Sequence, residues 1–291
     1  MRQNKDGMWA IFFLAPATLL LVLFVVGPII SSLILTFFEW DLLTPPEWVG
    51  LENFRTMFQD GDFYQALGNT FYFIAGYVPA VMILGLLVAT VMNHNIPFRS
   101  GLRVAFFLPV VSSWVAVALL WRWIFNPKFG LINFFIGLFG ITGPSWLFDP
   151  NWAMPAIIIT SVWKDIGFAM MIFLAGLQDI PKQFYEAAAI DGAGKQRQFF
   201  SITIPILSPV IFFLLTILII NSFQVFDQVW VMTGGGPAGS TSVMVQQIYL
   251  NAARYGEMGY AAALSWVLFC FIFLVTFLQM QFQKRWVHYA S

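Results

Sequence analysis

The chain has little charge and almost no cysteine. Of its 291 residues, 10% are charged, whereas a soluble domain usually carries about 25%. The formal net charge is zero, which gives no electrostatic reason for binding nucleic acid. The single cysteine, Cys270, excludes an internal disulfide and a thiolate metal cluster. We therefore expect no metal, no cofactor and no nucleic-acid partner.

Apolar sequence takes the place of charge. The chain is 59% hydrophobic with a mean hydropathy of +0.79, and a membrane-crossing helix needs about 20 apolar residues. Six segments meet that requirement, at 9–37, 67–92, 103–125, 152–177, 203–225 and 261–282. These runs are too long for the strands of a membrane barrel. The sequence predicts an all-α membrane protein with six transmembrane helices, forming a single domain over residues 1–291.

The first apolar run also needs to be distinguished from a secretory signal. The run from Met8 to Phe38 is much longer than the 7–15 apolar residues of a signal peptide. It also lacks a small-x-small cleavage site followed by polar sequence. We expect it to be a retained first span.

The basic residues predict the orientation. With the N-terminus inside, the inner segments hold Arg2, Lys5, Arg99, Arg103, Lys182, Lys195, Arg197, Lys284 and Arg285. The outer segments hold Arg55, Arg122, Lys128 and Arg254. Cytoplasmic loops are the ones enriched in Lys and Arg. Both termini are therefore predicted to be cytoplasmic.

The inner loop between the fourth and fifth spans has the features of a short surface helix. Asp179 can cap such a helix, Pro181 suits its first turn, and the alanines after Glu186 favour its continuation. Gly192 and Gly194 permit a stop with positive φ. We expect a helix of about ten residues, roughly 15 Å long.

Part of this loop is similar in sequence to a phosphate-binding motif. The run Gly192-Ala193-Gly194-Lys195 resembles the end of a P-loop, but that motif needs Gly where Ala189 stands and Ser or Thr where Gln196 stands. We predict no nucleotide site in this chain.

The same loop carries a family resemblance. The run Glu186-Ala187-Ala188-Ala189-Ile190-Asp191-Gly192-Ala193, followed by Phe200, Pro205 and Pro209, resembles the EAA loop of binding-protein-dependent ABC transporter permeases. Other segments resemble the carbohydrate branch, namely the subunit type of the maltose and glycerol-3-phosphate permeases: Phe107-Leu108-Pro109, 130–133, 174–177 and Gly234-Gly235-Gly236-Pro237. The resemblance covers nearly the whole chain.

The resemblance implies a fold, partners and a location. It implies the type I importer permease fold, with a coupling helix in the loop 179–200 that docks on a cytoplasmic ATPase. The residues implied in this coupling are Glu186, Ala187, Ala188, Asp191 and Gly192. The partners would be a second, different permease subunit, two ATPases that hydrolyse the ATP, a periplasmic or extracellular sugar-binding protein, and membrane lipid. The location would be the cytoplasmic (inner) membrane of a bacterium or archaeon. From the residues alone, the short helix could instead lie flat on lipid headgroups.

The candidate substrate pathway lies within the fourth and fifth spans. A charge inside a span costs about 2.5–3.5 kcal/mol on insertion scales, so Lys164 and Asp165 in the middle of the fourth span are candidates for function. The resemblance matches these two and five others to positions that line a sugar pocket, namely Phe168, Leu218, Asn221, Ser222 and Val225. Two structural alternatives stay open: ion pairing by the two charged residues, and interhelical hydrogen bonding by Asn221 and Ser222.

We therefore predict a non-enzymatic permease subunit that forms half of the pathway for a sugar, either an oligosaccharide or a related carbohydrate. A glycerol-3-phosphate-type or other polyol substrate in the same machinery is the first alternative. The second is a self-sufficient secondary transporter, a class in which repeated halves or several intramembrane acids are common. The apolar Leu218 and Val225 and the charged Lys164 and Asp165 leave the identity of the sugar open.

Overall fold

The computed structural model describes the backbone of residues 3–287 and the side chains of residues 12–287. Its contacts divide the chain into two compact units. One unit consists of the residues up to Asp60 together with Gln247–Val267. The other consists of Gly61–Gln246 and the residues from Leu268 onward.

The first unit begins with the first predicted span. Its elements are α1 (Gln3–Leu21), a π-helical turn (Val22–Val26), α2 (Gly27–Leu35), the antiparallel strands β1 (Phe38–Glu39) and β2 (Glu47–Trp48), α3 (Glu52–Gln59), a second π-helical turn (Leu250–Tyr255) and the start of α14 (Met258–Trp286). The apolar stretch Phe12–Leu35 is not buried anywhere along its most apolar window. Most of this stretch is therefore available for contact with lipid or with another chain.

The sheet of this unit is fastened to the start of α14. A Cβ atom added at Gly259 would lie 1.8 Å from the carbonyl oxygen of Phe38, so only glycine permits this approach. The Asn53 amide donates to the carbonyl oxygens of Thr36 and Phe38, each at 2.9 Å. The Tyr260 hydroxyl donates to Asp60 at 2.6 Å.

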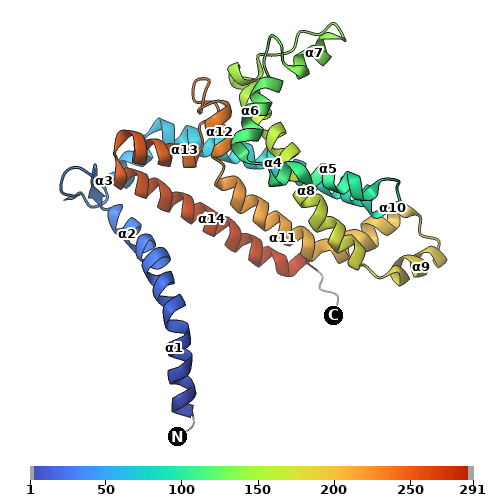
Figure 1. The fold of residues 1–291 in the computed structure, drawn as a ribbon, viewed down its shortest axis with the longest axis horizontal. Helices are drawn as coiled ribbons and strands as arrows, with labels where there is room; N and C mark the ends of the chain where they lie inside the picture. Colours follow the sequence, from blue (N-terminus) through green and yellow to red (C-terminus); the bar gives the residue numbers. More distant parts are fainter. Residues whose placement is uncertain (1–2, 288–291) are drawn as a thin grey trace. The chain divides into compact units, whose positions relative to one another are not determined.

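The second unit holds the other spans. Its helices are α4 (Gly61–Asn93), α5 (Arg99–Val111), α6 (Trp114–Ile124), α7 (Leu131–Gly137), a 3-10 turn (Trp146–Phe148), α8 (Pro150–Asp179), α9 (Lys182–Ile190), α10 (Lys195–Gln198), a π-helical turn (Phe199–Thr203), α11 (Ile204–Phe223), α12 (Asp227–Met232), the beginning of α13 (Met244–Tyr249) and the remainder of α14. The helices α4, α8 and α11 pack on one another (Figure 1).

The fold class predicted from the sequence is confirmed, with one difference in the third span. Among the described residues, five helices are long and apolar enough to cross a membrane, and a bent pair brings the total to as many as six. The predicted third span, 103–125, is this pair, and the helix axis bends by 102° between α5 and α6. The break lies at Ser112 and Ser113, whose ψ angles of 145° and 137° are outside the helical range.

The fourth span, α8, is the centre of the unit. Over half of its most apolar window is buried, 56% against 28% for α4 and for the fifth span. Small residues permit close packing around it. A Cβ added at Gly85 of α4 would lie 2.6 Å from Ala169, and one added at Gly167 would lie 1.9 Å from the Phe106 carbonyl oxygen of α5. Such small-residue contacts are typical of helices packed within a membrane.

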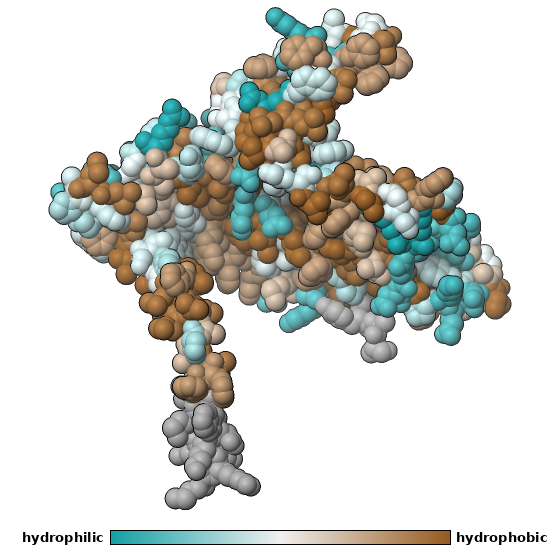
Figure 2. All heavy atoms as spheres, in the orientation of Figure 1, coloured by the Kyte–Doolittle hydropathy of each residue, from teal (hydrophilic) through white to brown (hydrophobic). Residues whose placement is uncertain are grey.

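The surface of this unit agrees with a membrane protein. Apolar residues cover much of the helical bundle, while hydrophilic residues gather at the end that carries α9 and α10 (Figure 2). That end is the polar loop that the sequence places between the fourth and fifth spans.

Candidate functional site: a midspan pocket and a projecting helix

The predicted short helix is present as α9. It spans nine residues, Lys182–Ile190, and ends before Gly192, whose φ of +80° fits the expected stop. Two local details differ from the prediction. Asp179 is the last residue of α8 and caps no part of α9, whose N-cap is Pro181. Gly194 has a φ of −67° and serves as the N-cap of α10.

The residues implied in coupling lie on an exposed helix. Glu186, Ala187, Asp191 and Gly192 are exposed and Ala188 is half-buried. The Tyr185 hydroxyl of the helix lies 2.9 Å from the Thr203 hydroxyl at the start of the fifth span. The arrangement presents two carboxylates, Glu186 and Asp191, and several small residues at the polar end of the unit.

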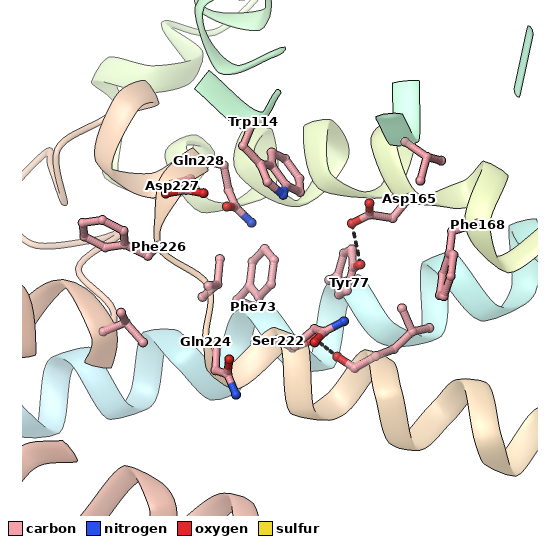
Figure 3. Close-up of a pocket in the computed structure, with 15 residues that line it drawn as sticks. Phe73, Tyr77, Trp114, Asp165, Phe168, Ser222, Gln224, Phe226, Asp227 and Gln228 are labelled. Atoms are coloured by element: carbon pink, nitrogen blue, oxygen red, sulfur yellow. Dashed lines mark hydrogen bonds between the residues drawn. The ribbon is translucent and has the colours of Figure 1, made fainter. Parts of the chain in front are cut away.

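A pocket of about 600 Å³ lies between the helices of the second unit. It is lined by Phe73, Tyr77, Val110, Trp114, Asp165, Phe168, Leu218, Asn221, Ser222, Gln224, Val225, Phe226, Asp227, Gln228 and Val245. Figure 3 shows these side chains around the pocket. Of the residues that the resemblance matched to a sugar pathway, Asp165, Phe168, Leu218, Asn221, Ser222 and Val225 line this pocket.

Asp165 is hydrogen-bonded across the pocket wall. The Tyr77 hydroxyl of α4 donates to its carboxylate at 2.7 Å (Figure 3). This bond ties α4 to α8 and leaves the second carboxylate oxygen for a ligand. An ion pair with the neighbouring Lys164 does not form, because adjacent helix positions point about 100° apart.

Lys164 does not line the pocket. It is 4% exposed, and its ammonium donates to the Val110 carbonyl oxygen at 2.9 Å. The ammonium also lies 4.7 Å from the centroid of the Trp114 ring, within the range of a cation–π contact. Val110 and Trp114 stand on the two sides of the break between α5 and α6. Lys164 therefore connects α8 to both halves of the bent third span and helps to position Val110 and Trp114 in the pocket wall.

The two polar residues of the fifth span differ in what they offer. The Ser222 hydroxyl donates to the Leu218 carbonyl oxygen one turn earlier on α11 (Figure 3). The Asn221 side chain is exposed and makes no hydrogen bond to the described residues. Asn221 is therefore the one of the pair whose hydrogen-bonding groups are available to a ligand.

Sequence reasoning missed the aromatic part of the pocket. Phe73 and Tyr77 stack with their ring centroids 5.1 Å apart, and Trp114 faces the same space. A tyrosine in the middle of the second span was the available signal, since its hydroxyl needs a partner there. Asp227 and Gln228 at the start of α12 also line the pocket.

The lining suits a neutral, hydroxyl-rich ligand. Aromatic faces provide apolar contact, while two carboxylates and several amides provide hydrogen bonds. Among the described residues, no group of three or more His, Cys, Asp or Glu could hold a metal ion.

Comparison with known proteins gives a consistent picture. The family model described as "Binding-protein-dependent transport system inner membrane component" matches residues 81–288. A Bacillus subtilis protein named "Probable ABC transporter permease protein YesP" is 37% identical, over 99% of this chain and 94% of its own length. The "Sulfoquinovosyl glycerol transport system permease protein SmoG" of Agrobacterium fabrum is 36% identical, over 93% of this chain and 89% of its own length.

One solved structure shares the fold over nearly the whole chain. It is a chain of a "bacterial alginate ABC transporter in complex with alginate pentasaccharide-bound periplasmic protein", with a TM-score of 0.85 and 22% identity. The match covers 98% of this chain and 96% of the other. At that identity, the likeness establishes the fold alone.

Proposed function

The chain belongs to the family of binding-protein-dependent transport system inner membrane components, and from this premise we propose that it forms half of the pathway of an ATP-driven sugar importer. Its pocket would receive a sugar released by an extracellular or periplasmic binding protein. The energy would come from ATP hydrolysed on partner subunits, because no nucleotide motif occurs in this chain. The proposed location is the cytoplasmic membrane, with both termini on the cytoplasmic side.

One observation carries the proposal: the pocket and the projecting helix share the same two spans. Asp165 and Phe168 lie on α8, and Leu218, Asn221 and Ser222 lie on α11. The helix α9 connects these spans, since α8 ends at Asp179 and α11 follows α10 and its π-helical turn. A movement imposed on α9 would therefore act on both walls of the pocket.

The named substrates of the similar proteins support a carbohydrate. The relative from Agrobacterium is named for sulfoquinovosyl glycerol, and the structural neighbour is crystallised with an alginate-bound protein. Both are acidic carbohydrates, so these names support the carbohydrate class and leave the charge of the sugar to the pocket lining. The stacked rings of Phe73 and Tyr77 and the free amide of Asn221 fit a pyranose, which has an apolar face and a rim of hydroxyls. A glycerol-3-phosphate-type substrate fits less well, because Lys164 faces away and the pocket holds two carboxylates.

The experiment that tests this proposal is a ligand screen on the cognate binding protein. The protein encoded beside this permease would be purified and its melting temperature measured with a panel of sugars, polyols and phosphorylated polyols. We expect stabilisation by at least one neutral sugar or oligosaccharide, because binding to the native state alone raises the melting temperature. Stabilisation only by glycerol phosphates, or by amino acids, would contradict the sugar assignment.

A further inference from the structure

A pair of arginines stands at the start of α5 without an anionic partner. Arg99 and Arg103 are one helical turn apart and both are half-buried. The Gln178 amide, with its oxygen turned toward them, accepts from Arg99 at 2.7 Å and from Arg103 at 3.1 Å. Within the described residues, no carboxylate lies within 4.0 Å of either guanidinium. Two positive charges therefore share a single neutral acceptor.

The surroundings of the pair add to the positive potential. Like charges at i and i+4 destabilise a helix, and so does positive charge in its first turn, next to the positive end of the helix dipole. The N-cap residue, Phe98, provides no side-chain acceptor for the first N–H groups. Arginine guanidiniums and free N–H groups at a helix start are both preferred partners of phosphate. The positive charge of the two guanidiniums therefore favours the binding of an anion.

An apolar groove lies further along α5, past the arginines. It encloses about 590 Å³ between α4, α5, α6 and α8, and α5 contributes Ala105, Phe106 and Pro109 to it. Phe106 follows Arg103 by three residues, which makes them neighbours on the helix surface. Pro109 lies ten residues beyond Arg99, about 15 Å along the axis. That length equals about half of the roughly 30 Å hydrocarbon core, or one leaflet.

We propose that this arrangement is a binding site for an anionic phospholipid. Arg99 and Arg103 bind the headgroup phosphate, and one acyl chain lies in the groove. Phe98, which is 88% exposed, lies beside the headgroup. The leaflet is the one on the side of α9, because Gln178 is one residue from the end of α8. Free phosphate shares the headgroup chemistry, but only a lipid also fills the groove. Basic pockets between spans on the cytoplasmic side are known to suit anionic headgroups.

The test measures lipid binding to the purified transporter complex after delipidation in detergent. Phosphatidylglycerol, phosphatidylcholine and inorganic phosphate are titrated separately, and the melting temperature is followed. The wild-type complex is expected to be stabilised by phosphatidylglycerol and not by the other two. In R99Q/R103Q the affinity for phosphatidylglycerol should fall roughly ten- to a hundredfold, as for the loss of charged hydrogen bonds.

Two control variants separate lipid binding from other roles. K195Q/R197Q removes the same charge from exposed positions on α10 and should keep the wild-type response. Q178L removes the bridge between α5 and α8 but keeps both cations, so its response should also remain. Unchanged lipid binding in R99Q/R103Q would overturn the proposal. Equal stabilisation of the wild-type complex by phosphatidylcholine or by inorganic phosphate would also overturn it. The same holds if R99Q/R103Q loses the ATPase subunit and the wild-type complex does not respond to phosphatidylglycerol.

A measurement on the wild type covers the case in which R99Q/R103Q does not fold. A phosphatidylglycerol with a photoreactive acyl chain is added to the complex, irradiated and mapped by peptide mass spectrometry. Labelling is expected on α5 or α8 at the groove, and unlabelled phosphatidylglycerol should compete with it. Labelling that phosphatidylcholine competes equally well, or that maps to other helices only, would refute the site.

Discussion

At the residue scale, Asn221 and Ser222 are adjacent in sequence but differ in what they can give a ligand. The Ser222 hydroxyl is already donated within α11, whereas the Asn221 amide has no partner among the described residues. Both residues line the pocket, and their role in the substrate pathway is a hypothesis. Their substitutions to alanine are therefore a matched pair.

We expect Asn221→Ala to lower the transport efficiency about tenfold. A hydrogen bond left unmade in a binding site typically costs about 1–3 kcal/mol, and about 1.4 kcal/mol is a factor of ten. The measurement is the initial rate of uptake at several sugar concentrations. Ser222→Ala is the control and should change the rate much less. Wild-type uptake by Asn221→Ala across the whole concentration range would remove Asn221 from the pathway.

Substitution of Asp165 tests whether its half-buried carboxylate stabilises the fold or binds the sugar. Asp165→Asn removes the charge but keeps an oxygen that can accept from Tyr77, whose hydroxyl now donates to the carboxylate at 2.7 Å. The complex should therefore assemble, as judged by size-exclusion chromatography, and its relative rates with different sugars should change. Tyr77→Phe, which removes only the donor, serves as the comparison. Failure to recover any assembled Asp165→Asn complex would show that the charge is structural.

At the element scale, the sequence predicted most helices and missed the geometry of one. Apolar length alone identified α4, α8 and α11, because a span must be long and apolar whatever its neighbours. The break between α5 and α6 was missed because hydropathy continues across Ser112 and Ser113. The aromatic wall of the pocket depends on that break, since Trp114 begins α6. Pairs such as Tyr77 with Asp165, which lie 88 residues apart in the chain, require the tertiary packing and have no signature in sequence periodicity.

The helix α9 gives the prediction that belongs to this scale. Gly192 has a φ of +80°, which proline cannot adopt, so Gly192→Pro should redirect the chain after α9. Glu186→Lys should reverse the charge that the helix presents. Each variant is expected to insert and assemble but to transport poorly, with ATP hydrolysis no longer stimulated by the loaded binding protein. Lys182→Gln, at the first helical position, is a control that should transport normally. Normal transport by both test variants would exclude α9 from coupling.

At the scale of the whole molecule, this chain presents surfaces that it does not cover itself. The first span, Phe12–Leu35, has none of its most apolar window buried. Asn221 in the wall of the midspan pocket is exposed, and α9 projects from the polar end. These features agree with a subunit that works with a second permease and with ATPases, as the proposed function requires. The family was recognisable from the sequence because its loop motif is local; the partner surfaces were not, because exposure appears only in the folded chain.

ATP-driven sugar import is tested most directly by sugar uptake into reconstituted proteoliposomes. The permease is purified with its partner subunits and reconstituted, and the loaded binding protein is supplied on the outer side. We expect accumulation of the labelled sugar only when ATP is inside, the binding protein is outside and both permease subunits are present. Uptake by this chain alone, driven by an ion gradient and abolished by an ionophore, would contradict it.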